Sequence, residues 1–223
     1  EDNLFRAEDI NYYDGYIERD EQGLSNLVLT NINGEEVEEI RPVNVFTGVD
    51  PASSTKKTAD YSVVFNIAID GDNNRFVLPY YRKRATPLDL ADAVITNFQH
   101  YKSAKTRIES VGYQEMLRQY IKEKSEELGL FIPGLEIKEN PRTSKSFRLE
   151  SLQPIFANKK VYIQPHMQAL MDELLLYPRG KNDDLLDGFF YANKNCYRPT
   201  HDPMLLYDEE DEYYGEPTNW KLL

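Results

Sequence analysis

Three separated acidic motifs are the residues of this chain best suited to chemistry. Asp50 ends the apolar run NVFTGVD, Glu109 follows the run TRI, and Asp183, Asp184 and Asp187 open the apolar segment NDDLLDGFFYA. Carboxylates are preferred ligands of hard cations such as Mg²⁺, and burying one without a partner is costly. Because these motifs lie far apart in the sequence, a fold must bring them together, and the pattern predicts a metal centre.

The apolar periodicity predicts the elements that would position these carboxylates. A first strand ends at Asp50, and two further strands over 61–69 and 75–83 are joined by the polar turn 70–73. Thr86, Pro87 and Asp89 predict the start of a helix. The remaining expected elements are strands at 105–109, 135–139 and 161–165, and helices at about 113–128, 144–157, 167–178 and 183–195. Three meander strands followed by alternating helices and strands predict an α/β domain with a mixed central sheet.

This order of elements predicts where the carboxylates lie. Asp50 and Glu109 would end two parallel neighbouring strands, at the carboxyl edge where α/β domains form their sites. Asp183, Asp184 and Asp187 would cluster on one face near the start of the last helix. Each has another interpretation, since acids also cap helix starts and an Asp before Pro51 suits a turn. Their joint occurrence favours the metal centre.

The net charge of −12 is unevenly distributed along the chain. Residues 1–42 hold 12 acidic and 3 basic side chains, and residues 202–223 hold 7 acidic and 1 basic, whereas residues 43–201 hold 19 acidic and 22 basic. A basic surface around an acidic centre suits a phosphodiester substrate bridged by divalent cations. The single cysteine, Cys196, excludes an internal disulfide and a CxxC metal site.

The same distribution suggests three parts. Residues 1–42 read as an arm or linker of irregular or weakly strand-forming character, with turns at Asp14–Gly15, Gly23 and Asn33–Gly34. Residues 43–201 would form the α/β domain, and residues 202–223 an acidic C-terminal tail. The Asn-Gly pair between LVLTNI and EEVEEI predicts a hairpin.

Four motifs carry a resemblance to a known family: FTGVDPASSTKKTADYSVV, RIESVGYQEML, SFRLESLQPIFANKKVYI and LYPRGKNDDLLDGFFYA. From about residue 43 to 196 the chain resembles the C-terminal nuclease domain of the large terminase subunit of tailed double-stranded DNA bacteriophages. The resemblance implies an RNase H-like fold and metal-dependent cutting of concatemeric viral DNA during genome packaging. It also implies an acidic triad of Asp50, Glu109 and Asp184, with Asp183, Asp187 and Asp60 as supplementary ligands.

Two features depart from the family pattern. Many members have a histidine before the paired aspartates, where this chain has Asn182, and no G-x-x-x-x-G-K-[ST] loop is present in these residues. The resemblance therefore implies that the chain is the nuclease part of a longer subunit and that residues 1–42 connect it to a packaging ATPase. The implied partners are double-stranded DNA, that ATPase, the portal protein and the small terminase subunit, and no membrane is among them. The implied place of action is the cytoplasm of the infected host cell.

The expected chemistry is hydrolysis of phosphodiester bonds with two Mg²⁺ or Mn²⁺ ions roughly 4 Å apart. Asp50 would bridge both ions because a central strand is a rigid mount, while Glu109 and Asp184 would each hold one. The all-carboxylate set favours these ions over Zn²⁺. The candidate contacts to the DNA phosphates are Lys56, Lys57, Arg82, Lys83 and Arg84. No base-reading motif is present, which predicts weak sequence preference.

Two other classes remain open from the sequence. A Holliday-junction resolvase or transposase-like nuclease would share the fold and the acidic residues, but would prefer branched DNA. A non-catalytic interaction module would use its acidic ends to dock a basic partner, and replacing Asp50 would leave its function intact.

Overall fold

The structure is a computed structural model that describes residues 3–52, 61–109, 114–135, 144–194 and 196–200. Its strands are β1 Asn11–Arg19, β2 Ser25–Ile32, β3 Glu35–Pro42, β4 Asn44–Asp50, β5 Ser62–Ile69, β6 Arg75–Lys83, β7 Lys105–Ile108 and β8 Val161–Ile163. Its α-helices are α1 Pro87–Tyr101, α2 Gln114–Glu127, α3 Lys145–Glu150, α4 Gln153–Ala157, α5 Gln168–Leu176 and α6 Asp184–Asn193, and a 3₁₀ helix spans Ala7–Asp9.

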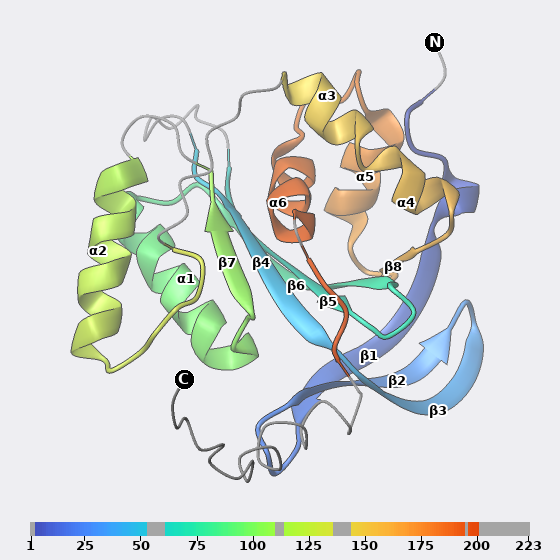
Figure 1. The fold of residues 1–223 in the computed structure, drawn as a ribbon. Helices are drawn as coiled ribbons and strands as arrows, with labels where there is room; N and C mark the ends of the chain where they lie inside the picture. Colours follow the sequence, from blue (N-terminus) through green and yellow to red (C-terminus); the bar gives the residue numbers. More distant parts are fainter. Residues whose placement is uncertain (1–2, 53–60, 110–113, 136–143, 195, 201–223) are drawn as a thin grey trace, which may run out of the picture.

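The strands of the described residues form one mixed sheet in the order β3-β2-β1-β8-β6-β5-β4-β7 (Figure 1). The meander β4-β5-β6 is antiparallel, and β7 pairs in parallel with β4 on its far side. The α/β architecture and the parallel pairing expected from the sequence are therefore confirmed. The strand expected at 135–139 lies almost entirely outside the described residues.

Helices cover both faces of the sheet, with α1 and α2 on one side and α3 to α6 on the other (Figure 1). Side chains of β5 alternate between these layers because successive residues of a strand point to opposite faces. Val63 and Phe65 pack beneath α6, whereas Val64 packs beneath α1 and α2. A strand buried on both faces reads as a nearly continuous apolar run, which explains the composition of β5.

The N-terminal region is more ordered than the sequence suggests. Residues 11–42 form β1, β2 and β3, and β1 joins the sheet by pairing in parallel with β8. The hairpin at Asn33–Gly34 is confirmed, but the turn predicted at Asp14–Gly15 is wrong. Those residues form a β-bulge inside β1, where a side chain at Gly15 would come within 2.4 Å of the Val28 carbonyl oxygen. Glycine there permits close strand approach instead of a turn.

The start of α1 has the capping box that the sequence predicts. The Thr86 side chain accepts a hydrogen bond from the Asp89 amide, and the Asp89 carboxylate accepts one from the Thr86 amide. We expect Thr86→Ala to lower the free energy of unfolding by about 1 kcal/mol, because an amide at the helix start loses its acceptor. Urea unfolding would measure this loss, and Thr86→Ser, which retains the hydroxyl, serves as the control. Equal stability of the two variants would contradict the cap.

None of the helices in the described part of the chain combines the length and apolar character that a membrane span requires.

Candidate active site

Asp50 and Glu109 lie side by side at the carboxyl edge of the sheet. The parallel register pairs Val49 of β4 with Ile108 of β7, and the Glu109 amide donates to the Val49 carbonyl oxygen at 3.1 Å. Asp50 and Glu109 are thus each the first residue after the last pair of the β4–β7 ladder. The sequence prediction that these two residues share one edge is confirmed by this register.

A close approach between α6 and β4 brings the third acidic motif to the same edge. A Cβ atom at Gly48 would lie 2.1 Å from the Gly188 carbonyl oxygen and 2.4 Å from the Ala192 amide nitrogen, so the two backbones are in direct contact. On this helix Asp184 lies one turn before Gly188 and Asp187 directly precedes it, and each aspartate is less than 10% exposed. The glycines therefore allow α6 to place two buried aspartates near Asp50.

Mutual repulsion and burial dominate the electrostatics of this cluster. Burial raises the pKa of Asp50 well above its usual range, and the charge of Asp187, a hydrogen bond with Glu109 and the charges of Glu109 and Asp184 raise it further. Burial also raises the pKa of Asp187, against the opposing effect of nearby cations. Neighbouring buried carboxylates cannot all ionise without a compensating cation. We refer to Asp50, Glu109, Asp184 and Asp187 as the carboxylate cluster.

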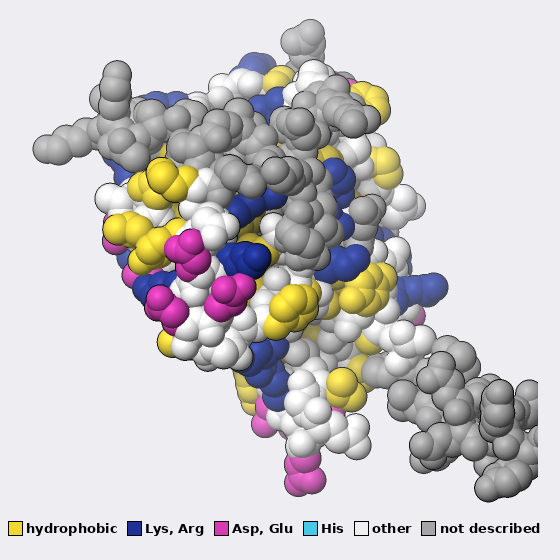
Figure 2. Space-filling view, turned by 60° about the vertical axis from the view of Figure 1, so that its left-hand side comes forward, with side chains coloured by type: hydrophobic (Ala, Val, Ile, Leu, Met, Phe, Trp, Pro, Cys, Tyr) yellow, Lys and Arg dark blue, Asp and Glu magenta, His cyan; other side chains and the backbone are white. Residues whose placement is uncertain are grey.

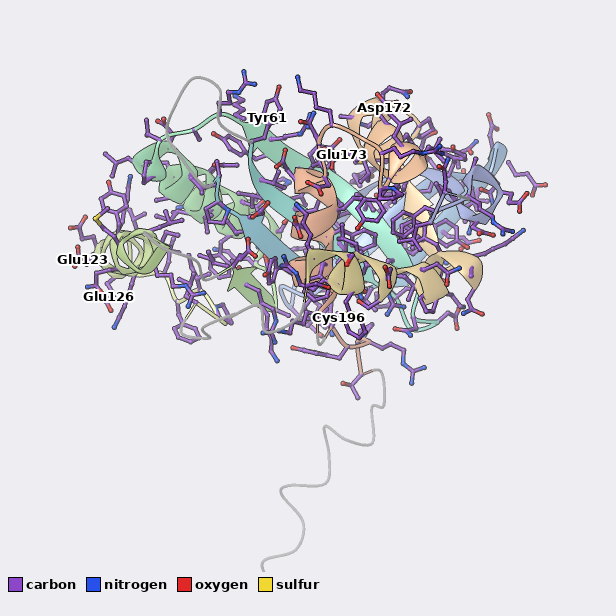
Figure 3. The ribbon with its side chains drawn as sticks, turned by 90° about the horizontal axis from the view of Figure 1, so that it is seen from above. Tyr61, Glu123, Glu126, Asp172, Glu173 and Cys196 are labelled. Atoms are coloured by element: carbon purple, nitrogen blue, oxygen red, sulfur yellow. The ribbon has the colours of Figure 1, made fainter. Side chains whose placement is uncertain are left out.

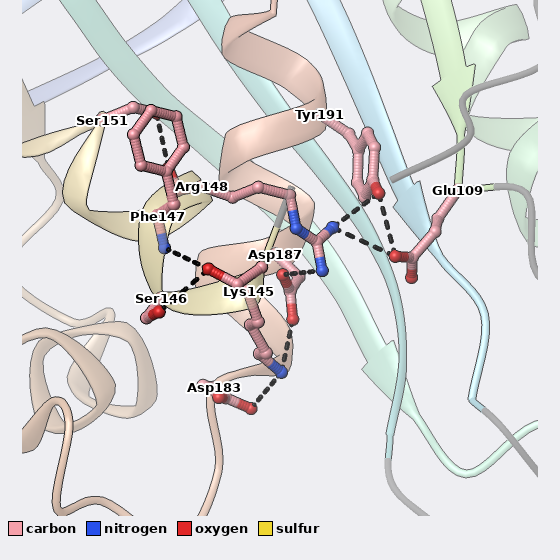
Figure 4. A network of polar contacts seen from close by, with 10 residues as sticks. Glu109, Lys145, Ser146, Phe147, Arg148, Ser151, Asp183, Asp187 and Tyr191 are labelled. Atoms are coloured by element: carbon pink, nitrogen blue, oxygen red, sulfur yellow. Dashed lines mark hydrogen bonds and ion pairs between the residues drawn. The ribbon is translucent and has the colours of Figure 1, made fainter. Parts of the chain in front are cut away.

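Two cations of α3 reach this cluster (Figure 4). The Lys145 ammonium lies 2.7 Å from Asp183 and 2.6 Å from Asp187, at the exposed rim. The buried Arg148 guanidinium lies 3.0 Å from a Glu109 oxygen and 3.7 Å from Asp187. Neither residue is expected from the sequence, although Arg148 lies in SFRLESLQPIFANKKVYI, one of the four motifs that carry the family resemblance.

A second buried ion pair supports the start of α6. Glu173 of α5 accepts a hydrogen bond from the Leu185 amide at 2.8 Å and pairs with Arg82 of β6 at 2.9 Å, beside Asp184. Burial raises the pKa of Glu173 to about 7, although Arg82 and the helix amides oppose the shift. Figure 3 shows Glu173 beside α6, far from Glu123 and Glu126 on α2. Since the Asp183 side chain makes no cap at this helix start, Glu173 takes over that task from another element.

The predicted phosphate contacts fall in different places. Arg82 and Arg84 both lie over the Tyr61 ring, with guanidinium carbons 4.1 and 5.0 Å from its centroid. Lys83, on the other face of the strand, lies over Tyr81. Arg82 also forms an ion pair with Glu173, so part of its positive charge is neutralised within the protein. Lys56, Lys57 and Asp60 lie outside the described residues.

The carboxylate cluster suits a hard divalent cation by its chemistry. Its donors are all carboxylate oxygens, which Mg²⁺ and Mn²⁺ prefer, and the raised pKa of Asp50 reflects a local excess of negative charge. As they stand, no three His, Cys, Asp or Glu side chains among the described residues are arranged to hold one ion. Glu109 and Asp187 direct oxygens to Arg148 and Lys145 instead.

The sheet order and the acidic edge define an RNase H-like α/β domain. The family model for the terminase RNaseH-like domain matches residues 47–195, and the chain belongs to this family. The match confirms the fold and the family expected from the sequence motifs. A search of curated proteins found no significant match.

Solved structures share this fold at low sequence identity. The large terminase nuclease from thermophilic phage G20c is 18% identical with a TM-score of 0.56, covering 88% of this chain and 100% of that one. The same nuclease with bound magnesium is 19% identical, with a TM-score of 0.53 and coverage of 86% and 96%. The human cytomegalovirus terminase nuclease domain is 12% identical, with a TM-score of 0.52 and coverage of 69% and 83%.

Proposed function

We propose that this chain is a metal-dependent endonuclease that cuts concatemeric viral double-stranded DNA during genome packaging. The observation that carries the proposal is the carboxylate cluster, whose three aspartates are buried at the carboxyl edge of the sheet where Asp50, Glu109 and α6 meet. Membership of the terminase RNaseH-like family supports the reaction class, and the magnesium bound to a related nuclease supports the choice of metal.

In this proposal the carboxylates divide the work of holding two Mg²⁺ or Mn²⁺ ions. Asp50, on the rigid central strand β4, would be the ligand shared by both ions, while Glu109 would hold one and Asp184 the other. Asp187, Asp183 and Asp60 supplement these ligands. When bound, the ions would activate a water molecule and stabilise the leaving 3′-oxygen. The protein contributes the fixed spacing of the carboxylates and a partly water-excluded edge.

The DNA backbone would lie across the same edge. Figure 2 shows Lys and Arg side chains spread over this face of the molecule, several of them near its middle. Lys56, Lys57, Arg82, Lys83 and Arg84 are the proposed phosphate contacts, and contacts to phosphates carry no direct sequence information. Weak sequence preference and strong salt dependence of DNA binding follow from such contacts.

Residues 1–42, which include strands β1 to β3 of the sheet, would connect the nuclease to a packaging ATPase, and residues 202–223, which lie outside the described residues, would form an acidic tail. The portal protein and the small terminase subunit are the proposed further partners. The proposed place of action is the cytoplasm of the infected host cell.

Cleavage of supercoiled plasmid DNA under metal titration tests the function. We expect no cleavage in EDTA and recovery of cleavage on adding Mg²⁺ or Mn²⁺, because the carboxylate cluster alone cannot activate water next to a phosphate anion. Linear duplex should be cut at least as fast as a four-way junction of equal length. Preference for the junction would favour a resolvase, and failure of both metals to support cleavage would overturn the proposal.

A further inference from the structure

Glu109 is held by two donors from different helices. One of its oxygens, Oε1, accepts hydrogen bonds from the Arg148 guanidinium at 3.0 Å and from the Tyr191 hydroxyl at 2.9 Å. Arg148 also donates to the Tyr191 oxygen at 2.6 Å, which closes a triangle of polar groups (Figure 4). Three mutual contacts fix the rotation of the carboxylate far better than one contact could.

Arg148 contacts carboxylates from two different elements of the cluster, Glu109 after β7 and Asp187 on α6. Its side chain is only 9% exposed, and one nitrogen reaches Glu109 beyond β7 while the other lies 3.7 Å from Asp187 on α6. A guanidinium is planar and presents its donors in a fixed fork, so it sets the distance and angle between the groups that it contacts. Lys145, one helical turn earlier, engages Asp183 and Asp187 at the rim.

We propose that Arg148 and Tyr191 are positioning residues that orient Glu109 for a divalent cation. They occupy Oε1 and thereby leave the second carboxylate oxygen available for ligation beside Asp50. Groups that hydrogen-bond to a metal-binding side chain fix its orientation, and their loss weakens metal affinity. This inference rests on the proposed function, because it assumes that the carboxylate cluster binds metal.

The direction in which metal affinity changes when Arg148 is removed tests the inference, because Arg148 has two opposing effects on the cation. Arg148 is a permanent cation next to the proposed metal position, so its charge alone would repel a divalent ion. If repulsion dominates, removing Arg148 strengthens metal binding. If orientation of Glu109 dominates, removing Arg148 weakens it. Tyr191 is neutral, so removing its hydroxyl isolates the effect of orientation from that of charge.

The experiment measures Mn²⁺ binding to the whole chain without DNA, by calorimetry and by electron paramagnetic resonance. We expect Tyr191→Phe and Arg148→Met each to weaken Mn²⁺ affinity by about 10-fold or more. Matched controls lie away from the carboxylate cluster. Tyr13→Phe removes another buried hydroxyl, which donates to the Val77 carbonyl at 2.7 Å, and Arg75→Met removes another buried guanidinium, which contacts Asn193 at the far end of α6. Both controls should bind Mn²⁺ within about twofold of the parent.

The outcomes separate this inference from the proposed function. If the parent binds Mn²⁺ and cuts DNA, but Tyr191→Phe and Arg148→Met bind Mn²⁺ as tightly as the parent or more tightly, the positioning role is wrong and the nuclease stands. If the parent binds no Mn²⁺, both proposals fall. Should Arg148→Met fail to fold, Tyr191→Phe decides alone, since it keeps the ring and its packing. Reduced kcat with unchanged KM for DNA would further distinguish positioning from loss of substrate binding.

Discussion

Replacing Asp50 with asparagine is expected to abolish DNA cleavage while making the metal-free protein more stable. The loss of activity should reach about 10³-fold or more, because in the proposed mechanism Asp50 is the bridging metal ligand and would supply several kcal/mol of transition-state stabilisation. The gain in stability follows from the surroundings of Asp50, which are buried and crowded by Asp187, Glu109 and Asp184. Asparagine keeps the shape of the side chain without its charge.

The pH dependence of this gain has a definite sign. Since folding raises the pKa of Asp50 above its usual value of 3.8, the folded chain retains a proton that the unfolded chain releases. Stability of the parent therefore falls as pH rises above that value, and the advantage of Asp50→Asn grows over the same range. At neutral pH an advantage of about 1 kcal/mol would raise the unfolding temperature by ~2–4 °C.

Calorimetric unfolding and plasmid cleavage together check both halves of the prediction. Mn²⁺ should stabilise the parent by binding to its folded state and should leave Asp50→Asn nearly unaffected. Asp92→Asn, which removes an exposed carboxylate of α1, is the control and should change neither property by much. An Asp50→Asn protein that cuts DNA like the parent would show that Asp50 is not an essential metal ligand.

Adding one methyl group at Gly48 is expected to damage both the fold and the active site. The Cβ of Gly48→Ala would fall 2.1 and 2.4 Å from backbone atoms of α6, which cannot rotate away as a side chain could. The helix must therefore shift, at a cost of about 1–3 kcal/mol or more. Because α6 carries Asp184 and Asp187, this shift separates them from Asp50, and a misplacement near 1 Å can cost about 10²-fold in rate.

Gly71→Ala provides the matched control for this change. A Cβ at Gly71 meets no atom within 4 Å, so the same substitution there should alter neither the urea midpoint nor the cleavage rate. Gly188→Ala should have an intermediate effect, because its Cβ would press on the Phe65 and Val63 side chains, at 2.9 Å each. Parent-like cleavage and stability of Gly48→Ala would show that the helix and strand are not held in contact.

The sequence predicts those parts of this structure that depend on local patterns. The Thr86 cap, strand β5 and the Asn33–Gly34 turn all arise from neighbouring residues, and each is found in the structure. The approach of Asp50 to Glu109 also follows, since parallel neighbours share an edge. These inferences need only periodicity and strand order.

The sequence does not predict contacts that arise only when distant elements meet. Arg148 and Glu173 look like ordinary charged residues of amphipathic helices, yet each is buried against the carboxylate cluster or its supporting helix. Gly15 and Gly48 look like turn or strand-breaking residues, but they mark places where two backbones touch. Only the packed structure reveals which partner each residue meets.

The short strand β8 has a consequence for how this domain can be divided. It pairs on one side with β1 and on the other with β6, through two residues on each side, and is the seam between the β1–β3 unit and the sheet that carries the carboxylates. The apolar residues Tyr13, Leu27 and Leu29 seal that seam against Phe76. Cutting the chain near residue 43 would expose an unprotected sheet edge and an uncovered apolar surface, a combination that promotes self-association. The smallest independently folding nuclease therefore extends well before the first carboxylate strand.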